Sequence, residues 1–308
     1  MTRSLALRLT QSPSRGFVTV ILLLGTFAGS WAFIFGRMAQ LENIPTSAII
    51  AFRMVLGTLM LTPLVLRRHG DELRQLNGND LLFAGGAGFW LALHLILGFS
   101  SLEHTSVLVS TMLVGMSPLW IALAEATLLR TRLSQLVWIG LFLTLSGSTI
   151  IALASGRDFA LGDNPGLGIL LCIGASLAGA AYAISGRSSR KKMSFLPYLW
   201  LVFLLGSIVS LLLVTVTHAP MTGFSGKGYL ALILLTIFPQ VIGHLVFNYA
   251  LRHLPATYCS VIGQTGMIEA GILAMLLFHE VPGPLLIPGS IAVIVGITLV
   301  NLAKTRGD

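Results

Sequence analysis

Glu269 lies near the centre of an apolar stretch that is long enough to cross a membrane, residues 261–280 with the sequence VIGQTGMIEAGILAMLLFHE. An ionisable side chain at the centre of a membrane helix costs about 2.5 to 3.5 kcal/mol on insertion scales, so it normally faces a partner or a watery cavity. Such a carboxyl can take up and release a proton. We therefore predict that Glu269 binds a proton or a cationic group of a cargo, with a structural ion pair or a protonated packing residue as the alternative.

Arg53 is a second charged residue within an apolar stretch. Its planar guanidinium could hold Glu269 in the ionised form, or it could bind a carboxylate of the cargo. A third interpretation is that it only hydrogen-bonds the carbonyl groups of a neighbouring helix. The sequence leaves these three roles open.

Two polar residues precede Glu269 on the predicted helix. Thr265 lies four residues earlier and therefore on the same helix face, whereas Gln264 lies about a turn and a half away. Both are predicted, with Glu269, to contribute to a binding site for substrate or proton.

Two prolines interrupt other apolar stretches near their centres. Pro239 precedes Gln240, and Pro118 follows Ser117. A proline within a helix removes one backbone hydrogen bond, which is tolerated in lipid only where protein or cavity water compensates. Gln240 and Ser117 are therefore predicted to border a cavity, with an ordinary packed kink as the alternative.

Three aromatic residues complete the predicted site. Trp31 and Tyr182 lie near the ends of their predicted helices, where they could gate a cavity, stack on cargo or anchor the helix at the membrane interface. Trp120 lies in the middle of its helix, at a position that matches Glu269 in an internal repeat. It could form an apolar wall opposite the carboxylate, or it could simply pack in the core.

Histidines and cysteines give no further chemistry. His94 and His244 could relay protons, although a lone membrane histidine more often hydrogen-bonds a neighbouring helix. Their spacing offers no metal template, and Cys172 and Cys259 form no CxxC pair. The sequence therefore predicts no metal, no cofactor and no disulfide.

Membrane helices must position these residues. The 308-residue chain is 55% hydrophobic and 10% charged, whereas soluble domains are about a quarter charged. Runs of the ~20 apolar residues that cross the hydrocarbon core predict ten spans. They cover residues 17–36, 46–66, 81–101, 105–128, 134–154, 166–186, 196–217, 229–250, 256–278 and 284–303. The short connections hold no soluble domain, so function is expected inside the bundle.

The basic residues predict the orientation. With ten spans and a cytoplasmic N-terminus, fifteen Lys and Arg residues fall on the cytoplasmic side, and only Arg37, Arg157 and Lys227 fall on the other. This bias follows the positive-inside rule and predicts both termini in the cytoplasm, with the chain in the plasma (bacterial inner) membrane. The net charge of +8 therefore reflects topology and not a nucleic-acid partner. Cleavage of the first span as a secretory signal would upset the bias and is not expected.

An internal repeat relates the two halves of the chain. Residues 139–154 aligned on 288–303 match Gly140 with Gly289 and Gly147 with Gly296, and a second match has the same offset of 149 residues. Five spans in each half make the second half enter the membrane from the opposite side. The predicted fold is therefore an all-α integral membrane protein with ten transmembrane helices in two inverted five-helix repeats, residues 1–156 and 157–308. Such repeats place a substrate site near the midplane and permit alternating access.

Several segments give the chain a resemblance to a known family. They are FRMVLG at 52–57, SPLW at 117–120, GAAYAISGRSSRK at 179–191, and HEVP at 279–282 with PGSIAVIVGITLV at 288–300. The chain resembles the EamA-type members of the drug/metabolite transporter superfamily. In that family an acidic residue, a short break and a Gly-rich final helix end each half. Glu280 fits this pattern in the second half, whereas its repeat partner, Thr131, departs from it.

The resemblance implies ten helices, with the first four of each half around a central cavity and the fifth of each half at the periphery. It also implies carriage of a small metabolite, such as an amino acid or a related amphiphile, commonly by efflux. An arginine near position 53 is frequent in the second span of this family, which favours a structural role for Arg53 over direct contact with substrate.

We therefore predict a secondary transporter, an exporter that works by alternating access and is coupled to protons through Glu269. The chain is predicted to act as a monomer, with a homodimer as the alternative. A membrane enzyme acting on a lipid or hydrophobic precursor is the main rival, but the chain has no HExxH, GxSxG or phosphate-loop motif. A receptor function is a second alternative, but it would not explain why the two halves of the chain are inverted repeats.

Overall fold

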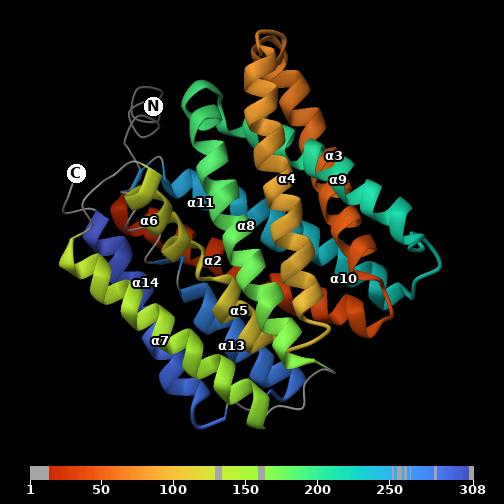
Figure 1. Ribbon diagram of the computed structural model, residues 1–308. Helices are drawn as coiled ribbons and strands as arrows, with labels where there is room; N and C mark the ends of the chain where they lie inside the picture. The colour runs from red at the N-terminus through yellow and green to blue at the C-terminus, as the bar shows by residue number, and fades with distance from the viewer. Residues whose placement is uncertain are drawn as a thin grey trace, which may run out of the picture.

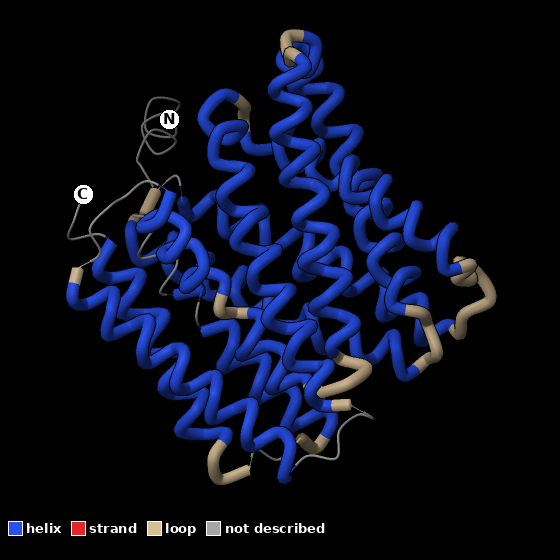
Figure 2. Tube along the Cα trace, viewed as in Figure 1, coloured by secondary structure: helices blue, strands red, loops and turns tan. Residues whose placement is uncertain are grey.

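The structure, a computed structural model, is helical throughout its regular elements. It describes residues 14–128, 134–158, 164–251, 253–254, 259, 262–263, 265–280 and 283–304. Figure 2 shows helices and loops, and no strand occurs in these ranges. The helices are α2 (Arg15–Leu41), α3 (Thr46–Arg74), α4 (Gly78–Ser101), α5 (Val107–Val114), α6 (Ser117–Leu128), α7 (Gln135–Asp158), α8 (Pro165–Lys192), α9 (Phe195–Thr217), α10 (Gly226–Leu235), the π-helical η1 (Thr236–Gly243), α11 (His244–Leu251), α13 (Thr265–Phe278) and α14 (Leu286–Lys304).

Six of the described helices are long and apolar enough to cross a membrane. They are α2, α3, α4, the Pro165–Gly186 part of α8, α9, and the rod Gly226–Phe247 formed by α10, η1 and the start of α11. Four shorter apolar segments accompany them, Val107–Ile121, Gln135–Ile151, Thr265–Phe278 and Ile287–Val300. Large apolar side chains are exposed on their surfaces, for example Leu82 at 72%, Phe142 at 71% and Val216 at 75%. A surface of this kind belongs in lipid, and the protein is an integral membrane protein.

Hydroxyl and amide caps decide where several helices begin. The Asn77 side chain accepts from the Asp80 N–H at 3.0 Å, and the Asp80 side chain accepts in return from the Asn77 N–H at 3.3 Å, which starts α4 with a capping box. Ser106 caps α5 and Ser225 caps α10 in the same sense, each accepting from the N–H three residues later. Helix starts are thus fixed by local polar residues at the ends of the apolar runs.

The helices of the two halves pack against each other. Helix α4 packs on α8 and α9, and α3 packs on α9, while α2 packs on α10, η1, α11 and α13. Helices α7 and α14 lie side by side along one edge of the molecule (Figure 1). This peripheral pair leaves the remaining helices to surround the centre of the bundle.

Glycines allow α7 and α14 to approach closely. A Cβ built on Gly140 would come within 2.6 Å of the Gly296 carbonyl oxygen, and one built on Gly147 would come within 2.6 Å of the Gly289 carbonyl oxygen. The sequence repeat matches Gly140 with Gly289 and Gly147 with Gly296. Each glycine therefore meets the repeat mate of the other one. This crossed pairing is what a twofold relation between the two helices produces.

The apolar core falls into separate clusters around the centre. One joins α2, α3, α4 and α9 through residues such as Ile34, Met54 and Phe203, and a second joins α5 to α7, α8 and α14. A small third cluster, Val18, Leu22, Ala250, Leu254 and Cys259, closes the ends of α2 and α11. The space between these clusters holds the candidate site.

Candidate functional site

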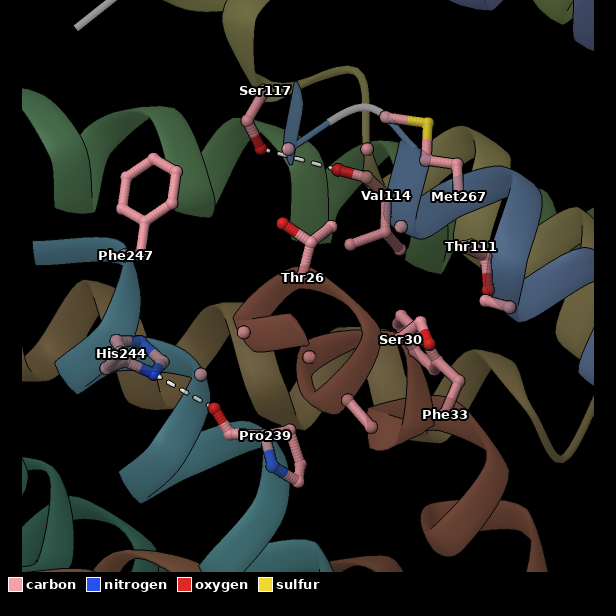
Figure 3. Close-up of a pocket in the computed structure, with 18 of the residues that line it drawn as sticks. Thr26, Ser30, Phe33, Thr111, Val114, Ser117, Pro239, His244, Phe247 and Met267 are labelled. Atoms are coloured by element: carbon pink, nitrogen blue, oxygen red, sulfur yellow. Dashed lines mark hydrogen bonds between the residues drawn. The ribbon is translucent and has the colours of Figure 1, made fainter. Parts of the chain in front are cut away.

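A cavity of about 480 Å³ lies between helices of both halves (Figure 3). Helices α2 to α6 contribute from the first half, and η1, α11 and α13 contribute from the second. Most of its wall consists of Gly, Ala, Val, Met, Pro and Phe. The polar residues among the described lining are Thr26, Ser30, Arg53, His94, Thr111, Ser117 and His244, and this lining includes no Asp or Glu.

Small residues on α2 open the cavity. Gly25 and Gly29 lie one helical turn apart and both line it. A Cβ on Gly29 would have no described heavy atom within 4 Å, whereas a Cβ on Gly25 would meet the Val246 side chain at 2.3 Å. Gly29 therefore leaves open space in the cavity, and Gly25 allows α2 and α11 to pack closely one helical turn away.

Two helices lose their regular geometry where they border the cavity. Helix α5 ends at Val114 and α6 begins at Ser117, and the Ser117 hydroxyl donates to the carbonyls of Val114 (3.3 Å) and Ser176 (3.0 Å). The η1 segment is π-helical around Pro239, whose carbonyl accepts from His244 Nδ1 at 3.2 Å (Figure 3). Proline removes a backbone hydrogen bond and π-helical turns often mark functional sites, so both irregularities favour this cavity as the candidate site.

Arg53 lines the cavity from α3 and is only 5% exposed. Its Nε donates to the side-chain oxygen of Gln240, and the Gln240 amide donates back to the Arg53 carbonyl at 3.1 Å. Its Cζ lies 5.6 Å from the ring centroid of Phe99. Its Nη1 atom is buried without a hydrogen-bond partner among the residues that the structure describes. The guanidinium is thus held by Gln240 at Nε, whereas its Nη1 has no described hydrogen-bond partner.

The two histidines are oriented by backbone carbonyls. His94 Nδ1 lies 2.8 Å from the Ala175 carbonyl oxygen, and His244 Nδ1 lies 3.2 Å from that of Pro239. A carbonyl can only accept, so Nδ1 carries the proton in both rings. In the neutral form each ring keeps Nε2 as an acceptor, and in the charged form it adds a donor.

A buried carboxylate joins the halves away from the cavity. Glu280 follows α13, is 5% exposed, and accepts from the backbone N–H groups of Val107 and Leu108, each at 3.0 Å. A carboxylate is well suited to the N-terminus of α5, where free N–H groups and the helix dipole meet. Burial raises the pKa of the Glu280 carboxyl above its ordinary value, against the two N–H groups and the Arg37 guanidinium, which lower it.

The family model of the EamA-like transporter family matches the chain twice, over residues 16–153 and 166–302. The chain belongs to this family. The resemblance found in the sequence is thereby confirmed, and the cavity lies between helices of the two matched segments.

Two proteins named as a transporter and an exporter match most of the chain. The uncharacterized transporter YdfC of Bacillus subtilis is 23% identical, covering 94% of this chain and 93% of its own length. The pseudopaline exporter CntI of Pseudomonas aeruginosa is 25% identical, covering 86% of this chain and 88% of its own length. A crystal structure superposes with a TM-score of 0.65 at 18% identity, covering 96% of this chain and 100% of that chain, which shows the common fold.

Of the residues that the sequence predicts for the site, Arg53 and Ser117 line the cavity. Gln240 is 1% exposed and does not line it, but it fixes the orientation of Arg53. Pro239, next to it, does line the cavity. Pro118, next to Ser117, does not belong to the described lining.

Glu269 does not belong to the described lining, although Gly266, Met267 and Ala270 on the same helix do. Its Oε1 accepts from the Thr265 hydroxyl at 3.2 Å, and its Oε2 is buried with no hydrogen-bond partner in the described part of the chain. No ion pair joins Glu269 to Arg53 among these residues. Gln264 lies outside the described residues.

The three aromatic residues pack against protein. Trp31 stacks on Phe35 with ring centroids 4.9 Å apart, and Trp120 Nε1 donates to the Ser176 hydroxyl at 2.7 Å. Tyr182 packs against the cluster around α2, α3, α4 and α9. They are absent from the described cavity lining. For Trp120, the contact with Ser176 agrees with the alternative of packing in the core.

Sequence reasoning missed the α2 wall of the cavity. Thr26 and Ser30 line it beside Gly25 and Gly29. The segment GTFAGS at 25–30 places two glycines and two hydroxyl residues at four-residue spacing. That spacing puts each pair on one helix face, and it is the signal that could have identified this wall.

Proposed function

We propose that this EamA-like protein is a secondary transporter that exports a small metabolite by alternating access. The observation that carries the proposal is the cavity, which is lined by both halves of the chain and bordered by two irregular helices. The similarity to CntI, which is named as an exporter, supports the direction. Because one chain lines the cavity from both halves, the proposed unit is a monomer.

The proposed topology is ten helices in two inverted repeats, residues 1–156 and 157–308, with both termini in the cytoplasm and the protein in the bacterial inner membrane. Six long and four shorter apolar helices support this count. The crossed glycine pairs between α7 and α14 support the inverted relation. The distribution of basic residues supports the orientation.

Flux from liposomes tests the proposal. Proteoliposomes loaded with a bacterial metabolite extract are expected to release particular solutes faster than protein-free liposomes, with the external solution analysed by mass spectrometry. If no solute leaves faster, the transport function is contradicted. Conversion of a lipid or precursor without any release would instead support the rival function of a membrane enzyme.

We also propose that transport is coupled to protons through Glu269. A partly buried carboxyl with one oxygen lacking a described partner is suited to gain a proton. Glu269→Gln keeps the shape of the side chain but cannot titrate, so the pH dependence of flux is expected to disappear. Thr265→Val serves as the matched control: it removes the hydroxyl that bonds the Ile262 carbonyl and Glu269 but keeps the titrating carboxyl, so flux is expected to stay pH-dependent. Unchanged pH dependence in Glu269→Gln would rule out this coupling.

A further inference from the structure

Among its described lining, the cavity has one fixed cation, Arg53, and no carboxylate to neutralise it. We propose that it selects solutes that carry a carboxylate, and that Arg53 binds this group. The inference rests on the proposed transport function and names the class of its cargo. It selects one of the three roles that the sequence leaves open for Arg53, and it differs from the hypothesis that Glu269 binds a cationic group of the cargo.

The surroundings of Arg53 leave one side of its guanidinium for a ligand. Nε is used by Gln240, and the ring of Phe99 lies close to Cζ. Nη1 is buried and unpartnered in the described structure, and Arg53 is one of the residues that line the cavity. A buried charge is costly unless it is paired. A carboxylate in the cavity would supply the missing counter-charge through a charge-assisted hydrogen bond, for which the planar guanidinium is well shaped.

The other ionisable residues of the described lining are histidines, which add positive charge when they are protonated. His94 and His244 face the cavity from α4 and α11, and each can only be neutral or positive. Glu269 is the nearest acidic residue in sequence to the α13 lining, and it lies off that lining. A cargo whose only charge is an ammonium group would therefore face Arg53 without a carboxylate beside it, which disfavours its entry.

The hydroxyl groups of the wall define the rest of the cargo. Thr26, Ser30 and Thr111 donate their hydroxyl hydrogens to backbone carbonyls of their own helices, at 2.9, 2.7 and 2.8 Å. Their oxygens are left as acceptors toward the cavity. Phe33, Phe247 and Met267 add apolar surface. The cavity therefore fits a small amphiphile with a carboxylate, a hydrogen-bond donor such as an amide N–H, and an apolar body.

Three matched solutes test this inference. N-acetyl-L-leucine carries a carboxylate, N-acetyl-L-leucinamide is its neutral amide, and L-leucinamide is a cation. Binding to the purified full chain is measured by isothermal titration calorimetry. The acid is expected to bind about tenfold more tightly than the neutral amide, since its carboxylate brings a full negative charge to the Arg53 guanidinium. The cation is expected to bind most weakly.

Arg53→Gln is expected to weaken binding of the acid about tenfold, toward the Kd of the amide, and to leave the Kd of the amide unchanged. Arg37→Gln is the matched control: it removes a guanidinium that donates to the Leu102 carbonyl at 2.6 Å and does not belong to the described lining. If Arg53→Gln does not fold, the relative affinities of the three solutes for the wild-type protein still test the carboxylate preference. No binding of the acid, or equal binding of acid and amide, would overturn the inference.

The liposome experiment separates this inference from the proposed function. Carboxylates are expected to be enriched among the solutes released from the loaded extract. Release without such enrichment would uphold transport and overturn the carboxylate preference. Binding of N-acetyl-L-leucine that depends on Arg53, with no release of any solute, would uphold the binding site and overturn transport.

Discussion

Replacing Gly29 with phenylalanine is expected to reduce flux to the level of protein-free liposomes while the protein remains folded. Gly29 lines the cavity from α2, and a Cβ at this position has no described heavy atom within 4 Å. The benzyl group would therefore enter open space and occupy the volume that a cargo needs. Because it displaces no packed atom near the Cβ, the temperature of unfolding is expected to change little.

Two controls identify the cause of the expected loss. Gly29→Ala adds only a methyl group to the same wall, so most flux should remain. Gly16→Phe makes the same substitution near the start of α2, where a Cβ also has open space in the described structure but does not face the cavity. Normal flux in that variant would exclude a general effect of an added phenylalanine on α2. Full flux through folded Gly29→Phe would show that cargo takes another route.

The helices were largely predictable because apolar length is a local property of the sequence. The predicted span 105–128 corresponds to α5 and α6, and 229–250 corresponds to α10, η1 and α11. The prolines at 118 and 239 indicated that both would be irregular near their centres. Helix ends were less predictable: helical structure reaches Arg74, beyond the predicted end at 66, with a kink at His69, where φ is −131° and ψ is 17°.

The site was predicted only in part, because periodicity shows which residues share a face and not which face meets the cavity. On α13, Gly266 lies against Thr26 and Gly271 lies against Leu108. These contacts with α2 and α5 set the rotation of the helix and turn Met267 and Ala270 toward the cavity, while Glu269 lies on another side. The charge of Glu269 and its place near the centre of the apolar stretch carry no information about that rotation.

Long-range pairing was the other missing information. Arg53 and Gln240 are 187 residues apart and hydrogen-bond each other. Gly57 makes room for this contact, since a Cβ there would come within 2.6 Å of the Gln240 amide nitrogen. Each residue was identified from its own segment, but nothing local connects the two. The bond to Gln240 orients the Arg53 guanidinium but leaves its Nη1 without a described hydrogen-bond partner. This geometry favours a contact between Arg53 and substrate, which the sequence left open as one of three roles.

Gly296→Ala is expected to lower the free energy of unfolding by roughly 1 to 3 kcal/mol, as overpacking does in other close-packed interfaces. The added methyl would lie 2.4 Å from the Thr144 hydroxyl oxygen and 2.6 Å from the Gly140 carbonyl oxygen. A backbone oxygen cannot move aside alone, so α7 and α14 must separate. The measurement is thermal unfolding in detergent. Gly86→Ala is the matched control, since its methyl meets no described heavy atom within 4 Å.

The repeat makes this prediction sharper. Gly147 is the repeat mate of Gly296, and its Cβ would come within 2.6 Å of the Gly289 carbonyl oxygen. If a twofold relation links α7 and α14, Gly147→Ala should cost about as much as Gly296→Ala. Gly140→Ala and Gly296→Ala push apart one shared contact, so their combined cost should be less than the sum of the two. If Gly296→Ala unfolds at the wild-type temperature, the close contact between α7 and α14 is contradicted. If the costs of Gly140→Ala and Gly296→Ala add fully, the two glycines do not share one contact.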